Sequence, residues 1–156
     1  MVTLIPMAQE DYASYLERSI REYAEDHVRN GNWQAEEALE KSRKQFMDLL
    51  PDGLQTKNEF IYSLVDESGE KIGILWVEVK MDATPRRAFG YDFWIKEELR
   101  GKGYGKQALA ALDEVLKSMQ VESMGLHVFG DNLNAQALYR KMGFEITGIH
   151  MRKKYK

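Results

Sequence analysis

The chain has 156 residues, of which 44% are apolar and 30% are charged, and its formal net charge is −3. This length and apolar content predict one compact domain over residues 1–156 with a hydrophobic core. The slight acidity is a poor match for non-specific nucleic-acid binding, which needs basic patches that neutralise phosphates. The sequence contains no cysteine, which excludes disulfides, thiolate metal sites and a cysteine nucleophile, and no other metal site is expected.

The N-terminal residues lack the basic start and the apolar run of a signal peptide. No stretch of about 18 consecutive apolar residues occurs, which argues against a membrane-spanning helix. We therefore expect a cytoplasmic protein without a membrane or nucleic-acid partner. A homodimer is among the assemblies that the sequence allows.

The first third of the chain predicts one short strand and two helices. Val2–Met7 is an apolar strand in which Pro6 is typical of an edge or an end. From about Gln9 to Arg29, aromatic and aliphatic residues recur at helical spacing. Asn32 is the expected cap of a second helix, which the Pro-Asp-Gly turn at 51–53 ends. We interpret both helices as packing elements, although an insert at this place would shape the substrate pocket of a small-molecule enzyme.

From about residue 60 the apolar residues recur at every second position, as in a strand. Phe60–Val65 and Ile72–Val79 flank a turn signal at 67–70, which predicts an antiparallel hairpin. A third strand, Ala88–Ile95, leads through a glycine-rich loop into a long amphipathic helix. Met124–Phe129 is the next strand, and a strand-helix-strand unit of this length implies a parallel pair.

A short helix follows, capped by Asn132 or Asn134, and Gly143 fits the left-handed residue past its end. The tail from Glu145 to Tyr155 is expected to return as a last strand. The predicted fold class is therefore α/β (α+β), a mixed and mostly antiparallel sheet with a central parallel strand pair and helices on both faces.

The run Arg100-Gly101-Lys102-Gly103-Tyr104-Gly105 stands between the third strand and the long helix. Its glycines allow a tight turn whose backbone N–H groups are not covered by side chains. If Tyr104 opens the helix, the partial positive charge of the helix end points at the same place. Arg100, Lys102 and Lys106 add further charge. Free amides, a helix dipole and basic side chains together favour binding of a phosphate or pyrophosphate.

This loop, together with the run N-L-N-A-Q-A-L-Y-R-K-M-G-F at 132–144, resembles the GNAT superfamily of acetyl-CoA-dependent N-acetyltransferases. Arg100, Gly103 and Gly105 match that family's pyrophosphate-binding pattern, which is Gln or Arg, two residues, Gly, one residue, then Gly or Ala. The second run resembles the segment in which an Asn and an Ala precede Leu-Tyr and Gly-Phe. Either motif alone is weak, whereas both in this order and spacing are specific. The resemblance covers about residues 58–150.

Residues 103–108 also satisfy the dinucleotide fingerprint G-x-G-x-x-G/A, and Asp131 falls about twenty residues on. That fingerprint should begin directly at the end of its strand, whereas residues 96–100 intervene here after Ile95. One strand-helix-strand unit preceded by a hairpin is also not a doubly wound sheet. A nicotinamide site is therefore disfavoured, as is a glycine turn with a purely structural role.

The resemblance implies transfer of an acetyl group from acetyl-CoA to a small-molecule or peptide amine, by direct attack in a ternary complex. It also implies that the parallel strands are splayed around the cofactor, and that a backbone N–H near Ile95 polarises the thioester carbonyl. The residues that it implies in cofactor binding are Ile95, Arg100, Gly101, Lys102, Gly103, Tyr104, Gly105, Lys106, Asn132, Ala135 and Tyr139.

Tyr139 is implied as the general acid for the departing thiolate, because a phenol with a pKa of about 10 suits that role. The competing interpretation is an aromatic residue on the buried face of a short helix. The base is left open between His127, Asp92, and a water relay or another carboxylate. His127 lies in a Leu-His-Val strand like that of alpha-amino acetyltransferases, and a bulge before the loop could turn Asp92 either way. His27 is expected at the surface.

A non-catalytic sensor of CoA or acyl-CoA with the same fold is the alternative function. Tyr139 favours the enzyme, because a sensor needs no acid at the sulfur atom. The acceptor is left open among a peptide N-terminus, a lysine and a small polyamine-like molecule, since the net acidity favours a cationic amine.

Overall fold

The computed structural model describes residues 1–155. Five strands and four α-helices follow one another along this part of the chain: β1 Thr3–Pro6, α1 Gln9–Arg29, α2 Ala35–Leu49, β2 Glu59–Val65, β3 Lys71–Val79, β4 Arg87–Ile95, α3 Tyr104–Ser118, β5 Ser123–Leu126 and α4 Leu133–Lys141. No helix among these described residues is both long and apolar enough to cross a lipid bilayer. The predicted order of elements is confirmed from β1 to α4.

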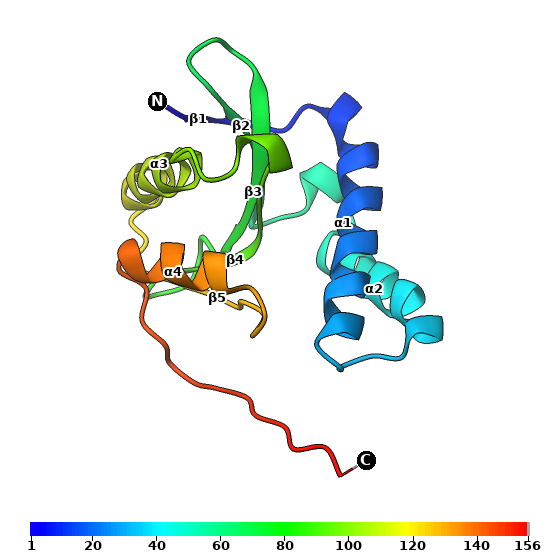
Figure 1. The fold of residues 1–156 in the computed structure, drawn as a ribbon. Helices are drawn as coiled ribbons and strands as arrows, with labels where there is room; N and C mark the ends of the chain where they lie inside the picture. The colour runs from blue at the N-terminus through cyan, green and yellow to red at the C-terminus, as the bar shows by residue number, and fades with distance from the viewer. Residues whose placement is uncertain (156) are drawn as a thin grey trace.

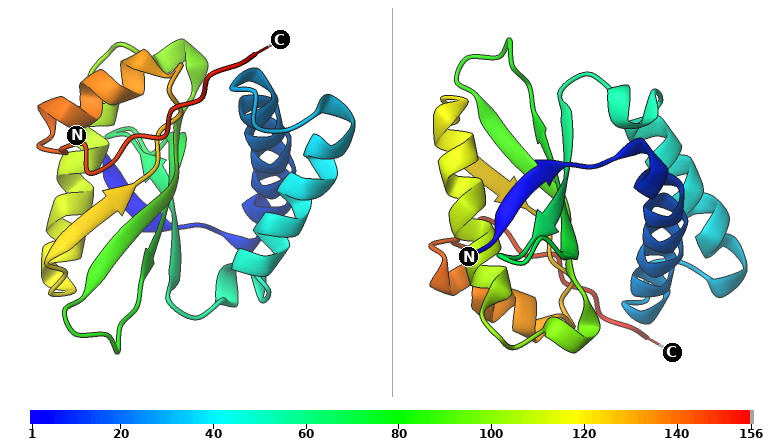
Figure 2. Two further views of the ribbon diagram at one scale, coloured as in Figure 1. Left: turned by 90° about the horizontal axis from the view of Figure 1, so that it is seen from below. Right: turned by 90° about the horizontal axis from the view of Figure 1, so that it is seen from above.

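The strands form one sheet in the order β1-β2-β3-β4-β5, in which β4 and β5 are parallel and all other neighbours are antiparallel. Helices α1 and α2 cover one face, and α3 and α4 lie on the other side (Figure 1, Figure 2). The expected mixed sheet with helices on both faces is confirmed. The parallel pair lies at one edge rather than at the centre, because the expected last strand does not form.

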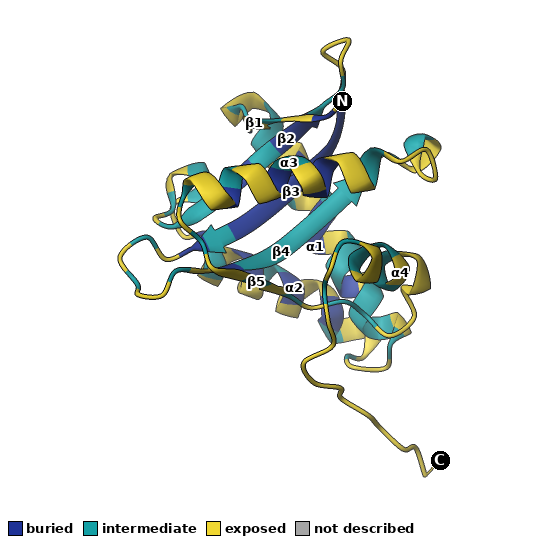
Figure 3. Ribbon diagram, turned by 90° about the vertical axis from the view of Figure 1, so that its left-hand side faces the viewer, coloured by how far each residue is buried: buried dark blue, intermediate teal, exposed yellow. Residues whose placement is uncertain are grey.

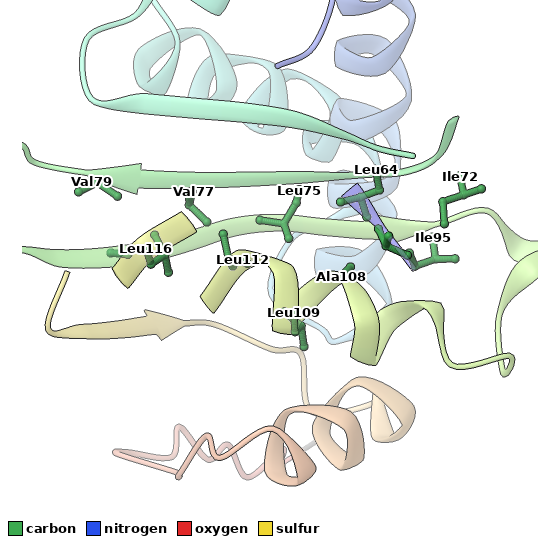
Figure 4. Close-up of a cluster of buried hydrophobic side chains, with 12 residues drawn as sticks. Leu64, Ile72, Leu75, Val77, Val79, Ile95, Ala108, Leu109, Leu112 and Leu116 are labelled. Carbon is green, nitrogen blue, oxygen red and sulfur yellow. The ribbon is translucent and has the colours of Figure 1, made fainter. Parts of the chain in front are cut away.

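The α3 side of the sheet holds the larger apolar cluster. Leu109, Leu112 and Leu116 recur at helical spacing on α3 and pack against Leu75 and Val77 of β3 (Figure 4). Full burial of such a side chain contributes about 1.5–3 kcal/mol. The stripe therefore fixes α3 on the sheet, and with it the glycine loop at the start of the helix.

A second apolar cluster lies between the sheet and the two N-terminal helices. Tyr15 and Ile20 of α1 and Phe46 of α2 pack with Trp76 of β3, and all four are at least 93% buried. This contact holds α1 against the strands that carry the candidate site residues. Both helices therefore pack against the sheet.

The expected strand from Glu145 to Tyr155 is wrong. These residues run away from the body of the molecule, exposed along their whole length (Figure 1, Figure 3). They make no backbone hydrogen bond within the described chain. Ile146, Ile149 and Met151 are 59%, 70% and 91% exposed, because no strand of this chain lies beside them. The side chain of Arg152 instead donates hydrogen bonds to the loop between α1 and α2.

The start of α2 also differs from the prediction. Gln34 caps this helix and forms a capping box with Glu37, whereas Asn32 was the expected cap. The side chain of Asn32 lies 2.9 Å from Nδ1 of His27 and accepts a hydrogen bond from Arg152. Asn32 is therefore engaged by other elements and is not available to the helix.

Two carboxylates face each other across β2 and β3. Glu59 and Glu78 are directly opposite in the register, and Oε1 of Glu59 accepts a hydrogen bond from Nε1 of Trp76 at 2.8 Å. Burial raises the pKa of Glu59 to about 8, with a further contribution from Glu78. The folded chain therefore keeps a proton on Glu59 at pH values where the unfolded chain has lost it.

Since the unfolded carboxyl titrates near its ordinary value of 4.5, the free energy of unfolding should fall as the pH rises from about 4.5 to about 8. We expect the thermal midpoint of the wild-type chain to decrease over this window. Glu59→Gln should reduce the decrease and raise the midpoint at the alkaline end. Glu40→Gln, at an exposed position of α2, is the control. A Glu59→Gln profile parallel to that of the wild type would contradict the assignment.

Candidate active site

The parallel pairing of β4 with β5 stops half-way along β4. Its last paired residues are Gly90 and Leu126, while β4 continues to Ile95. β5 therefore ends at Leu126 and not at Phe129, where the sequence pattern placed its end. The two strands part beyond this point, so residues 91–95 present backbone groups that have no partner on β5. This opening is called the splay below.

A β-bulge turns the side chains of β4 at the same place. Trp76 of β3 pairs with Asp92, but Val77 pairs with Gly90, so Tyr91 is the extra residue. The bulge lets Tyr91 and Asp92 both face α1. The ring of Tyr91 lies 4.8 Å from that of Trp76, and Asp92 is bonded to side chains of α1. The direction of Asp92, which the sequence left open, is thereby settled.

The carboxylate of Asp92 is held by two hydroxyls of α1. Its Oδ2 accepts hydrogen bonds from Tyr15 at 2.8 Å and Ser19 at 3.2 Å. Burial raises the pKa of Asp92, and this effect exceeds the lowering by the two hydroxyls and by the charge of Arg18. The Arg18 guanidinium lies 3.7 Å from the centre of the Trp94 ring. A carboxylate with a raised pKa is a stronger base than an exposed one.

The glycine loop adopts the open conformation that the sequence predicts. Gly101 and Gly103 have φ of 76° and 88°, and a Cβ at either position would meet no atom within 4 Å. Helix α3 begins at Tyr104, and no side chain caps its N-terminus at Gly103. The first amides of the helix are therefore free to bind an anion. Residues 101–106 are called the cradle below.

Basic side chains border the cradle in two ways. Lys102 and Lys106 are exposed beside it. Arg100 donates a hydrogen bond from Nε to the carbonyl oxygen of Ile95 at 2.8 Å. Arg100 therefore links the cradle to the end of β4. This contact is additional to the positive charge that it was predicted to contribute to anion binding.

The first turn of α3 packs closely against its neighbours. A Cβ on Gly105 would lie 3.0 Å from Cδ2 of Leu138 on α4 and 3.7 Å from the ring of Phe93 on β4. A larger residue at this position would require the Leu138 side chain to move. Gly105 thus has a packing role in addition to its match to the pyrophosphate-binding pattern.

Helix α4 begins and ends as predicted. Oδ1 of Asn132 accepts a hydrogen bond from the backbone N–H of Ala135 at 3.2 Å. Gly143 has a φ of 94°, and the N–H of Phe144 donates to the carbonyl of Tyr139, which closes the helix. Contact of Asn132 or Ala135 with a cofactor stays a prediction.

Tyr139 is half-buried on α4, with its ring centroid 6.4 Å from that of Phe93 and 5.5 Å from that of Phe144. Burial raises the pKa of its phenol to about 12, and the charge of Asp92 contributes to the rise. The phenol therefore stays protonated and is coupled electrostatically to Asp92. Tyr139 also lines a groove of about 1240 Å³, which it shares with His127.

The two histidines differ from what the sequence indicated. His127 follows the end of β5, is exposed, and lies 5.0 Å from the ring of Phe129. His27, expected at the surface, is half-buried and stacks on Trp33 with 3.9 Å between the ring centroids. Its Nε2 is buried and has no hydrogen-bond partner in the described part of the chain. Burial lowers the pKa of His27, and the nearby His127 adds to this effect.

The C-terminal end of α1 is tied to the loop before α4. Arg29 forms ion pairs with Asp26 and Asp131, and Nδ2 of Asn30 donates to Oδ1 of Asp131 at 3.1 Å. Asp26, Arg29 and Asp131 border a cavity of about 270 Å³ that Phe129 also lines. Asp131, which fits the spacing of a dinucleotide fingerprint, is therefore engaged by α1.

Burial and, to a smaller extent, the charge of Asp92 raise the pKa of Tyr139, and His127 lines the same groove as Tyr139. Sequence reasoning missed Tyr15 and Ser19, the partners of Asp92. The aromatic spacing of α1 marked Tyr15 as a packing residue. Nothing in the pattern connects it with Asp92, which lies 77 positions further along the chain.

A mixed sheet with a splayed parallel pair, next to an uncapped helix N-terminus, is the arrangement that the GNAT resemblance implies. The profile of the Acetyltransferase (GNAT) family matches residues 14–144. Two relatives from Bacillus subtilis (strain 168) bear the name N-acetyltransferase. YycN is 42% identical over 98% of both chains, and YdgE is 34% identical over 97% of this chain and 96% of the relative. The crystal structure of YycN matches with a TM-score of 0.96 at 41% identity, covering 100% of this chain and 99% of that one.

The chain therefore belongs to the GNAT family of acetyltransferases and is an acyltransferase, which confirms the predicted class. The family generally uses acetyl-CoA as the acyl donor. The family match over residues 14–144 includes Asp92 and its two partners on α1, Tyr15 and Ser19.

Removal of the Tyr15 hydroxyl tests its control of Asp92. Because this hydrogen bond lowers the pKa of Asp92, Tyr15→Phe should raise that pKa further. Loss of a hydrogen bond to a charged group should also cost about 1.5–3 kcal/mol of stability. An NMR titration of the Asp92 side-chain carboxyl carbon measures the pKa directly.

Tyr12→Phe, earlier on the same helix and without a hydrogen bond to Asp92, is the matched control and should leave the titration unchanged. If Tyr15→Phe gave the wild-type titration, the Tyr15 hydroxyl would not be bonded to the carboxylate in solution.

Proposed function

We propose that the chain transfers an acetyl group from acetyl-CoA to a cationic primary amine, by direct attack of the amine in a ternary complex. The observation that carries this proposal is the splay of β4 from β5 beside the uncapped N-terminus of α3, with the Asp92 carboxylate held by Tyr15 and Ser19. A covalent enzyme intermediate is not needed, and the sequence has no cysteine to form one.

The cradle fits the pyrophosphate of acetyl-CoA. Its amides at the start of α3 are uncapped, and the space in front of Gly101 and Gly103 is open. When bound, acetyl-CoA supplies an activated acetyl thioester. The backbone of residues 91–95, which has no partner on β5, would bind the pantetheine arm, and an N–H near Ile95 would polarise the thioester carbonyl.

Asp92 is the proposed base. Tyr15 and Ser19 orient its carboxylate, and burial raises its pKa, so that it accepts a proton from the acceptor ammonium more readily than an exposed carboxylate does. His127 is kept as the alternative base, because it lines the same groove as Tyr139.

Tyr139 is the proposed acid. A phenol with a pKa of about 12 is a weak donor to a thiolate whose conjugate acid has a pKa of about 8.5. However, the negative charge of Asp92 is one cause of this high value. When Asp92 takes up the proton of the amine, that contribution disappears and the phenol becomes more acidic. Protonation of Asp92 would therefore make Tyr139 a better proton donor.

The acceptor is proposed to be cationic because the chain carries a net charge of −3, and net acidity favours a cationic partner. A peptide N-terminus, a lysine and a polyamine all meet this requirement.

Gly103→Val tests the cradle. The positive φ of Gly103 and the approach of the pyrophosphate both require a residue without a side chain, so we expect CoA to bind at least about tenfold more weakly, or 1.4 kcal/mol. Isothermal titration calorimetry measures the affinity. Gly69→Val is the matched control, because Gly69 has a φ of 90° and equally open surroundings in the distant β2–β3 turn. Equal affinities in the two variants would contradict the cradle.

Tyr139→Phe should lower turnover about 100-fold, the usual contribution of one general acid, with little loss of CoA affinity. The measurement is thiol release from acetyl-CoA with a panel of cationic amines. Tyr155→Phe, on an exposed tyrosine, is the control. If Tyr139→Phe kept wild-type turnover, Tyr139 would be a packing residue and not the general acid. Cofactor binding without thiol release, for the wild type with every amine, would favour a sensor.

A further inference from the structure

Arg18 of α1 lies beside the candidate site but has no role in the steps proposed above. It follows Tyr15 by three positions, so it lies on the same side of the helix as this partner of Asp92. Its guanidinium is 3.7 Å from the centre of the Trp94 ring and 5.6 Å from that of Tyr15. Trp94 belongs to the part of β4 that has parted from β5. Arg18 therefore lies between the helix that holds the proposed base and the strand proposed to bind the acyl donor.

Two nitrogens of this guanidinium are buried and unpaired. Nε and Nη2 of Arg18 have no hydrogen-bond partner in the described part of the chain. Oε2 of Glu22 lies 3.7 Å from Nε, which is too far for a hydrogen bond. A buried donor without an acceptor costs free energy, and native structures rarely leave one in this state. An acceptor group from a bound molecule would remove this cost.

The unpaired nitrogens form one edge of the guanidinium. Their N–H groups point in parallel, which matches the two oxygens of a carboxylate. Trp94 covers the face of the guanidinium and not this edge. The Arg18 side chain is also 23% exposed, so it is not sealed in. A small shift of the guanidinium across the ring keeps the stack and opens the edge to a ligand.

We infer that Arg18 binds the carboxylate of an acceptor that is an amino carboxylic acid, with the ammonium group of the same molecule at Asp92. This inference rests on the proposed function, in which Asp92 takes the proton of the amine. The charge of Arg18 reaches Asp92, since it lowers the pKa of that carboxyl. The two residues therefore present a positive and a negative group that complement a zwitterion.

The inference narrows the acceptors that the net charge leaves open. The charge of Arg18 repels a second ammonium group, which disfavours a polyamine. The carboxylate comes from a free amino acid or from an acidic residue of a peptide. Two series of acceptors distinguish these sources: amino acids of increasing chain length, each with its own amide, and peptides with glutamate or glutamine at the second position.

Arg18→Gln tests the inference through thiol release from acetyl-CoA with both series. We expect the wild-type kcat/KM to favour the carboxylate over its amide by about tenfold or more in at least one series, as for a hydrogen bond between charged groups. Arg18→Gln should abolish this preference by raising KM for the acid, without changing amide turnover or CoA affinity. Arg18→Lys should restore it only in part, because lysine keeps the charge but not the parallel N–H groups. Arg21→Gln, on an exposed arginine of the same helix, is the matched control.

Equal kcat/KM for acids and amides in the wild type would overturn the inference while leaving acetyl transfer intact. A polyamine as the best acceptor, or a preference that Arg18→Gln retains, would do the same. If no amine releases thiol, the proposed function fails and binding decides instead, with the NMR signal of the Trp94 indole N–H followed as acids and amides are titrated into the CoA-bound protein. Tenfold tighter binding of an acid, lost in Arg18→Gln, would support the role of Arg18. Equal or undetectable binding would overturn both.

Discussion

The end of pairing between β4 and β5 is the constraint on which the rest of the site depends. The extra residue at Tyr91 changes the direction of β4 just after its last contact with β5 at Gly90. Backbone groups of residues 91–95 are thereby released toward the splay, while the Asp92 side chain is turned to α1. One irregularity in one strand therefore positions both the backbone proposed to bind the acyl donor and the carboxylate proposed as the base.

Electrostatic coupling across the splay joins the two proposed proton-transfer residues. Asp92 is kept basic by burial, and its charge in turn helps to keep the phenol of Tyr139 protonated. Each group alone is poorly matched to its task, since an exposed carboxylate is too weak a base and a phenol with a pKa of about 12 is too weak an acid. Transfer of one proton to Asp92 would remove the smaller of the two causes that raise the pKa of Tyr139, while the effect of burial would remain.

The sequence predicted those features that depend on local geometry. The helix over Gln9–Arg29, the glycine cradle and the cap at Asn132 follow from the spacing of apolar residues and from the backbone freedom of glycine. Features that depend on distant contacts were not predictable. The bonds from Tyr15 and Ser19 to Asp92 join elements more than 70 positions apart, and no pattern in either segment specifies them.

The wrong prediction for residues 145–155 has a physical cause of the same kind. Alternating apolar residues such as Ile149 and Met151 indicate a strand, but a strand exists only where another segment accepts its hydrogen bonds. His27 was misplaced for a related reason, because its burial depends on Trp33 and Phe129, which meet it only in the folded chain. A local pattern indicates which secondary structure a segment is able to form. Whether that structure forms depends on contacts with segments that are distant in the sequence.

The two edges of the sheet differ in how they are protected from further pairing. β1 is short and ends with Pro6, whose missing N–H prevents further pairing at that end. The edge of β5 has no such protection, since residues 123–128 contain neither proline nor lysine. Natural proteins normally blunt an exposed edge to prevent association. Residues 145–152, which the sequence pattern placed in the sheet as part of a last strand, line the same groove as β5 but make no backbone hydrogen bond to it. The edge of β5 is open because that pairing is not made.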